Sequence, residues 1–118
     1  MISRSHRFHG YAALGRVYRN GRVIRGPLFS IKFDLNERRK SYRMAVVVSK
    51  KVDKSAVRRN RIRRRLYEAV RLLETDILEP YDIVVTVFHA AAAEEPAKSL
   101  SHQVKKQLRE AGIIAKRT

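Results

Sequence analysis

The sequence contains no cysteine and no tryptophan, and only 3 of its 118 residues are proline. Without cysteine there is no disulfide framework, no thiol nucleophile and no cysteine-based zinc or iron–sulfur site, and secretion gains no support. The longest purely apolar run covers residues 44–48. A membrane-spanning helix needs roughly 20 such residues, and charged residues stand where a signal peptide has its apolar segment. These absences predict a soluble, cytoplasmic protein.

Acidic residues are also scarce. Against 11 Asp and Glu, the first of them Asp34, stand 27 Lys and Arg, which gives a formal net charge of +16. Such a surplus causes self-repulsion in the compact state, so we expect a polyanionic partner. A membrane-surface helix would combine its basic face with bulky Trp, Phe and Leu, whereas the apolar residues here have the spacing of a globular core. Nucleic acid is therefore favoured over an anionic membrane.

Two segments in the first half of the chain have the composition of strands. Residues 28–35 alternate strictly, which predicts a half-buried strand with Phe29, Ile31, Phe33 and Leu35 on the buried face. Residues 42–49 are rich in β-branched side chains and suit an antiparallel neighbour of that strand. Because residues 44–48 are apolar on both faces, the sequence predicts a central strand with cover on each side.

The strongest helix pattern covers residues 55–75. A stripe of Ile62, Leu66, Ala69, Val70 and Leu73 indicates its buried face, with Ser55 or Asp53 as the N-cap. The other expected elements are a helix over residues 10–19 followed by a turn or cap at Gly21, a strand over 22–24, a strand over 81–88 and a helix over 96–111 that stops at Gly112.

The predicted order is therefore helix, three strands, helix, strand, helix (αβββαβα). This order favours an α+β fold, a sandwich of one sheet covered by helices, with the basic helix crossing over the sheet. The length suits one domain, which we place over residues 1–118 with flexible ends at 1–6 and 115–118.

The helix over residues 55–75 is unusually basic, since seven of the fourteen residues from Arg58 to Arg71 are Arg. At about 100° per residue, one face outside the core stripe gathers Asn60, Arg63, Arg64, Tyr67 and Arg71. Guanidinium groups donate paired hydrogen bonds to phosphate oxygens, and an asparagine both donates and accepts. The alternative is a solvated face, but solvated helices mix signs, and like charges without counter-ions repel at these spacings. Contact with RNA or DNA is favoured.

The motif around this helix resembles a known signature. Ser49-Lys50-Lys51 at the end of a strand, followed by Ala56-Val57-Arg58-Arg59-Asn60-Arg61-Ile62-Arg63-Arg64, is similar to the Arg-Asn-Arg element of the bacterial ribonuclease P protein subunit. The resemblance covers residues 7 to about 112. It implies one α+β domain with a left-handed crossover through the basic helix, although about 98% of such crossovers are right-handed. It also implies a role in 5′ maturation of precursor tRNA.

The resemblance implies that the RNA subunit carries out the catalysis and that the protein binds RNA. The catalytic centre and the Mg²⁺ ions belong to the RNA subunit, and the protein, expected as a monomer and 1:1 with that RNA, is inactive alone. The resemblance implies RNA contacts by Lys50, Lys51, Arg59, Asn60, Arg61, Arg63 and Arg64. The basic helix itself adds Arg58, Tyr67 and Arg71 to the predicted RNA-binding residues, although many family members have a basic residue in place of Tyr67. The implied contacts with the single-stranded 5′ leader are Leu14, Tyr18, Ser30 and Lys32, where Tyr18 would stack on a base and Lys32 would bind phosphate. Core packing is the alternative for Tyr18.

Residues for other chemistry are not apparent. The four histidines have no metal-ligand spacing, Glu94-Glu95 suits a helix start, and there is no glycine-rich phosphate loop or serine nucleophile motif. A self-contained nuclease therefore lacks its metal ligands, and we predict no catalytic and no metal residues. A ribosomal or chaperone-type structural RNA-binding protein remains the alternative, because it would explain the charge, though not the full motif.

Overall fold

The structure, a computed structural model, describes residues 6–7 and 11–115. Predictions that concern residues 1–5, 8–10 and 116–118 lie outside the described residues, which includes most of the two flexible ends. The elements follow the predicted order, and the α+β class is confirmed. They are α1 (Tyr11–Asn20), β1 (Arg22–Arg25), β2 (Phe29–Leu35), β3 (Arg43–Val48), α2 (Ala56–Arg71), a 3₁₀ turn η2 (Glu74–Asp76), β4 (Tyr81–Val87), a 3₁₀ turn η3 (Ala90–Ala93) and α3 (Ala97–Ala111).

The basic helix α2 is shorter at its C-terminus than the sequence predicts. It ends at Arg71 and gives way to η2, because the backbone switches to tighter bonds: the Leu73 N–H donates to the Val70 carbonyl at 2.9 Å. The turn is held from the sheet side, where the hydroxyl of buried Tyr42 donates to the Glu74 carboxylate at 2.9 Å. At the other end of the chain, α3 stops where predicted, at Gly112, which has a left-handed φ of 79°.

The sheet has the order β1-β2-β4-β3, which corrects one prediction. β2 and β3 are not neighbours, because β4 lies between them, antiparallel to β2 and parallel to β3. The crossover through α2 makes this insertion possible, since it carries the chain from the end of β3 back to the start of a parallel strand. The inner strands are therefore β2 and β4, whereas β3, predicted to be central, is at the edge, with a bridge from Arg7 to Met44 on its outer side.

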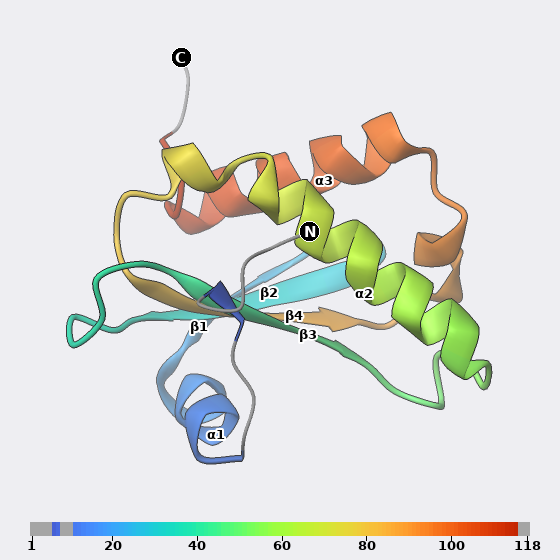
Figure 1. The fold of residues 1–118 in the computed structure, drawn as a ribbon, viewed down its shortest axis with the longest axis horizontal. Coiled ribbons are helices and arrows are strands. Elements are labelled where there is room, and N and C mark those ends of the chain that lie inside the picture. The colour runs from blue at the N-terminus through green and yellow to red at the C-terminus, as the bar shows by residue number, and fades with distance from the viewer. Residues whose placement is uncertain (1–5, 8–10, 116–118) are drawn as a thin grey trace.

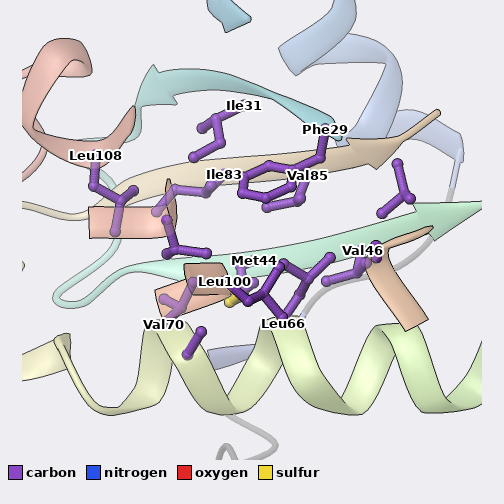
Figure 2. Close-up of a cluster of buried hydrophobic side chains, with 14 of the residues drawn as sticks. Phe29, Ile31, Met44, Val46, Leu66, Val70, Ile83, Val85, Leu100 and Leu108 are labelled. Carbon is purple, nitrogen blue, oxygen red and sulfur yellow. The ribbon is translucent and has the colours of Figure 1, made fainter. Parts of the chain in front are cut away.

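The edge strand β3 nevertheless has cover on both faces, as its composition predicts. Figure 1 shows α2 and α3 on one side of the sheet and α1 on the other. The main core lies under α2 and α3, where side chains of the sheet and both helices meet (Figure 2). A second, smaller cluster on the other face joins Val17 of α1 to Ala45 and Val84. Leu35, predicted on the buried face, is exposed because it ends β2.

The two sides of the sheet differ in how completely they are covered. Two helices of 15 and 16 residues cover the main core, but α1 has only 10 residues and packs on a few side chains. Part of the sheet beside α1 therefore stays open to solvent. No helix of the described part of the chain is long and apolar enough to cross a membrane.

Gly21 sets how closely α1 approaches the sheet. Its φ is not left-handed, but a Cβ at this position would lie 2.5 Å from the Val17 carbonyl oxygen and 2.9 Å from that of Phe33. We expect Gly21→Ala to push α1 away from β2 and to lower the free energy of unfolding by about 2 kcal/mol, or about 10 °C in Tm by thermal denaturation. Gly15→Ala is the matched control, because only the flexible Arg19 side chain comes within 3.2 Å there. An equal loss in both variants would contradict this role of Gly21.

Candidate RNA-binding surfaces

The N-terminus of α2 is fixed by a short polar network in the loop that follows β3. Asp53 Oδ1 accepts from the Ser55 N–H at 3.0 Å, and Ser55 Oγ accepts from the Arg58 N–H at 3.2 Å. Ser55 is thus the N-cap that the sequence predicts. This network fixes the path of the loop before α2, which contains no glycine. Lys50 and Lys51, which are exposed, stand at its start, directly before the basic helix.

On one flank of α2, the arginine side chains form hydrogen bonds and ion pairs with other segments of the protein. Arg58 bridges the carboxylates of Asp53, at 2.6 Å, and Glu94. Arg61 donates through Nε to the Ala93 carbonyl at 2.9 Å. Arg65 donates to the carbonyls of Ala92, at 2.7 Å, and Glu95. The expectation that the helix lacks counter-ions is therefore wrong for Arg58, which pairs with two carboxylates outside the helix, whereas Arg61 and Arg65 bind neutral backbone carbonyls.

These contacts shift the pKa values of the carboxyl groups. The hydrogen bonds from Arg58 hold the pKa of Asp53 and of Glu94 below their ordinary values. Near the other end of the helix, the hydrogen bond from Arg71 lowers the pKa of Glu68 to about 2. All three carboxylates stay ionised at neutral pH. Arg58 and Arg71 are thus the arginines of α2 with carboxylate partners, whereas Arg59, Arg63 and Arg64, on the other face of the helix, form no ion pair with a described residue.

That other face carries the predicted RNA contacts with the most accessible donors. Arg63 donates to Asn60 Oδ1 at 2.6 Å, which aligns the two side chains on the surface. Arg59 donates to the backbone carbonyls of Asp53 and Lys54 at 3.0 and 2.9 Å. Among the described residues, no hydrogen bond or ion pair involves the exposed Arg64, and the same is true of the two lysines at the start of the loop. Guanidinium and ammonium groups held in this way suit phosphate oxygens.

Like Arg58 and Arg61, two further predicted RNA contacts, Tyr67 and Arg71, have partners within the protein and lie outside this accessible group. Tyr67 is half-buried against the main core, and its hydroxyl accepts from the Val46 N–H at 3.3 Å. Arg71 forms a paired salt bridge with Glu68, at 3.0 and 2.5 Å. Their contribution to RNA binding stays a prediction. Among the ten residues, the structure thus brings together a surface of Lys50, Lys51, Arg59, Asn60, Arg63 and Arg64, which we call the α2 basic face.

The predicted leader contacts lie on the opposite side of the sheet, around α1. Tyr18 is 43% exposed, so core packing does not account for it; the neighbouring Val17, 1% exposed, is the core residue. Lys32 of β2 reaches over α1, where its Nζ donates to the Tyr18 carbonyl at 2.6 Å and lies 5.6 Å from the centre of the Tyr18 ring. An exposed aromatic ring and an ammonium group therefore stand side by side.

The other two predicted leader contacts extend this surface. Ser30 is two residues from Lys32 on the same face of β2, beside Thr86 of β4. Leu14 is half-buried against the small α1 cluster, one turn before Tyr18. We call the surface of Leu14, Tyr18, Ser30, Lys32 and Thr86 the α1 groove, a name for these five residues on the face beside α1 and not for a cavity. Sequence reasoning missed Thr86, although a polar residue inside the apolar run of residues 81–88 is a usable signal for the open face of a strand.

The acidic and histidine side chains of the described residues do not form a metal site. No three of them come together within that part of the chain in a way that could hold a metal ion. The buried Asp82 instead accepts from Arg43 Nε at 2.7 Å and from Asn36 Nδ2 at 3.0 Å, a network at the start of β4. Asp53, Glu68 and Glu94 also pair with arginines, and the described residues offer no recognisable donor set for Mg²⁺.

Comparisons with known proteins give one consistent result. Residues 2–112 match the family model for Ribonuclease P. The ribonuclease P protein component of Roseiflexus sp. strain RS-1 is 36% identical over 113 residues, 96% of this chain and 91% of its own length. That of Chloroflexus aurantiacus strain J-10-fl is 33% identical, with 96% of this chain and 82% of its own length covered.

Solved structures agree with the sequence matches. The chain superposes on a Staphylococcus aureus RNase P protein, a mutant with defective mRNA degradation activity, with a TM-score of 0.83 and 25% identity, covering 93% of this chain and 91% of the other. The Thermotoga maritima RNase P protein shares the fold, with a TM-score of 0.78, 21% identity and coverage of 88% and 96%. These likenesses cover nearly the whole chain described above.

Proposed function

The chain belongs to the ribonuclease P protein family and is the protein subunit of this tRNA-processing endoribonuclease, and we propose that it binds two RNAs with opposite sides of its sheet. In this proposal the α2 basic face binds the ribonuclease P RNA, and the α1 groove binds the 5′ leader of the precursor tRNA. The observation that carries the proposal is the separation of the two surfaces. A surface for one RNA alone would not need exposed Tyr18 and Lys32 on the face away from α2.

The chemical step is assigned to the RNA subunit. Asp53, Glu68, Asp82 and Glu94 pair with arginines, and the described residues offer no cluster for a metal ion. We therefore place the Mg²⁺ ions and the catalytic centre in the RNA and expect the protein alone to be inactive. Its net charge of +16 reduces the phosphate repulsion between catalytic RNA and substrate, which lowers the magnesium concentration needed for assembly. We further propose a cytoplasmic 1:1 complex in which the protein is monomeric before assembly.

Multiple-turnover cleavage of a precursor tRNA at low Mg²⁺ tests this function. A bacterial ribonuclease P RNA is assayed with and without the protein, and the protein is assayed alone. We expect strong activation of the RNA and no cleavage by the protein. Tight RNA binding without activation would favour the alternative, a ribosomal or chaperone-type structural protein, which should also bind precursor and mature tRNA equally.

Tyr18 provides a residue-level test of the α1 groove. Loss of one base-stacking contact is worth about 1–3 kcal/mol, so Tyr18→Ala should weaken binding of precursor tRNA to the assembled enzyme about 10-fold. Binding of mature tRNA and assembly with the RNA subunit should not change, and Tyr18→Phe should retain the wild-type affinity. Equilibrium binding at one fixed salt concentration measures all three. A large fall in Tm for Tyr18→Ala would instead restore a packing role.

A further inference from the structure

A second exposed aromatic side chain lies on the same side of the sheet as the α1 groove. Of the aromatic side chains that the structure describes, only Tyr18 and Phe88 are largely exposed, at 43% and 49%. Tyr42, Phe29 and Phe33 are buried in the main core. An aromatic ring that is largely exposed contributes little of its hydrophobic burial to the stability of the fold. Two such rings on one face therefore suggest a ligand with flat apolar surfaces.

The placement of Phe88 follows from the strand that precedes it. Side chains of β4 alternate between the main core, which takes Val85 and Val87, and the α1 side, which takes Val84 and Thr86. Phe88 continues this alternation because its N–H still pairs with the Leu28 carbonyl, at 3.0 Å. Its ring therefore belongs to the α1 side, next along the strand after Thr86.

The backbone on both sides of Phe88 is fixed. On one side, the Phe88 N–H bonds to the Leu28 carbonyl. On the other side, His89 caps η3, because its Nδ1 accepts from the Ala91 N–H at 3.0 Å. η3 is in turn held by the arginine donors of α2 described above. An aromatic ring on a fixed backbone loses little entropy on binding, which favours its use as a stacking platform.

Positive charge accompanies the ring. Ser49 lies beside Phe88, because the parallel register pairs Val48 with Val87. Arg25, which is exposed, lies on the same face at this end of the sheet, opposite Ser30. A nucleobase on Phe88 would thus have the Arg25 guanidinium on its own side of the sheet for its phosphates. This combination of an aromatic platform and a basic border is typical of sites for single-stranded nucleic acid.

We propose that Phe88 is a second base-stacking residue for the 5′ leader, at the far end of the α1 groove from Tyr18. The inference rests on the proposed function of that groove and extends its length. At about 3.3 Å per residue, Phe88 lies about 13 Å along the strand from Val84, the partner of Lys32. At about 3.4 Å per stacked nucleotide, this distance corresponds to up to about four leader nucleotides.

The test measures affinity of the holoenzyme for precursor and mature tRNA with Phe88→Ala, Phe88→Tyr and Tyr18→Ala. Phe88→Ala should weaken precursor binding about 5- to 10-fold and leave mature tRNA unchanged, and Phe88→Tyr should retain affinity. Leu78→Ala is the control, because Leu78 is 84% exposed in the connection between α2 and β4. Precursors with a single abasic leader nucleotide then give a coupling measurement: at one position, loss of the base should abolish the effect of Phe88→Ala.

The possible results distinguish the role of Phe88 from the proposed function of the α1 groove as the leader site. If Tyr18→Ala weakens precursor binding and Phe88→Ala does not, the groove stands and the role of Phe88 is refuted. If Phe88→Ala weakens mature and precursor tRNA equally, or weakens assembly with the RNA subunit, the ring acts outside the leader site and the inference is also refuted. If neither variant affects the precursor, the α1 groove is not the leader site. Thermal unfolding of each variant verifies that the fold is retained.

Discussion

Replacing Lys50, Arg63 and Arg64 together by glutamine is expected to weaken assembly with the ribonuclease P RNA about 10²- to 10⁴-fold, since each charge-assisted contact is worth about 1–2 kcal/mol. All three lie on the α2 basic face, and none forms an ion pair with a described residue. The salt dependence is the more specific result. Because each lost phosphate contact removes about 0.7–0.9 from the slope of log K against log salt, the slope should fall by about 2 to 3.

The matched control removes the same three charges elsewhere. Lys98, Lys105 and Lys106 lie on α3, outside both proposed surfaces, so their replacement by glutamine should change the slope by much less. Tm should stay near the wild-type value for both triple variants, because neither set holds the fold together. If the α3 variant weakened assembly as much as the α2 variant, binding would depend on net charge alone. That result would remove the α2 basic face from the proposal.

The sequence predicts elements well where the pattern is local. The order of helices and strands, the Ser55 cap and the Gly112 stop all depend on residues close together in the chain, and all are confirmed. Strand pairing depends on the crossover through α2, which no local pattern encodes, and the predicted antiparallel pairing of the strands around Ile31 and Val46 was wrong. Both β3 and β4 are apolar on two faces, so composition alone did not identify which is central.

The candidate site shows the same limit. The helical wheel of α2 placed the half-buried Arg63 and the exposed Arg64 outside the core, as the structure has them, but it could not show that Arg58 pairs with Glu94, 36 residues away. It also treated Tyr67 as a surface residue, whereas the ring is half-buried and bound to β3. A charged residue has the same sequence signature whether its partner is a phosphate or a distant carbonyl. Only the tertiary structure separates the two kinds of arginine on this helix.

That separation leads to the second large effect, at Arg65. Its guanidinium donates to the Ala92 and Glu95 carbonyls and so ties α2 to the segment between η3 and α3. Hydrogen bonds from a charged donor are worth about 1.5–3 kcal/mol each, so Arg65→Ala should lower the free energy of unfolding by about 3 kcal/mol, measured by urea denaturation. Arg65→Lys should rescue little, because an ammonium group cannot reproduce the planar fork that reaches two carbonyls.

Arg64 is the control for Arg65, because the two are neighbours on one helix and the charge removed is the same. Arg64→Ala should leave the free energy of unfolding unchanged and reduce the salt slope of RNA binding by about one unit. Arg65→Ala should do the reverse, with a large loss of stability and an unchanged slope once the protein is folded. The contrast between the two variants is more informative than either value. If all the arginines of α2 faced RNA, both variants would reduce the salt slope of RNA binding by the same amount. Two equal losses of stability would show that Arg64 also holds the fold, and the α2 basic face would then lose its most accessible guanidinium.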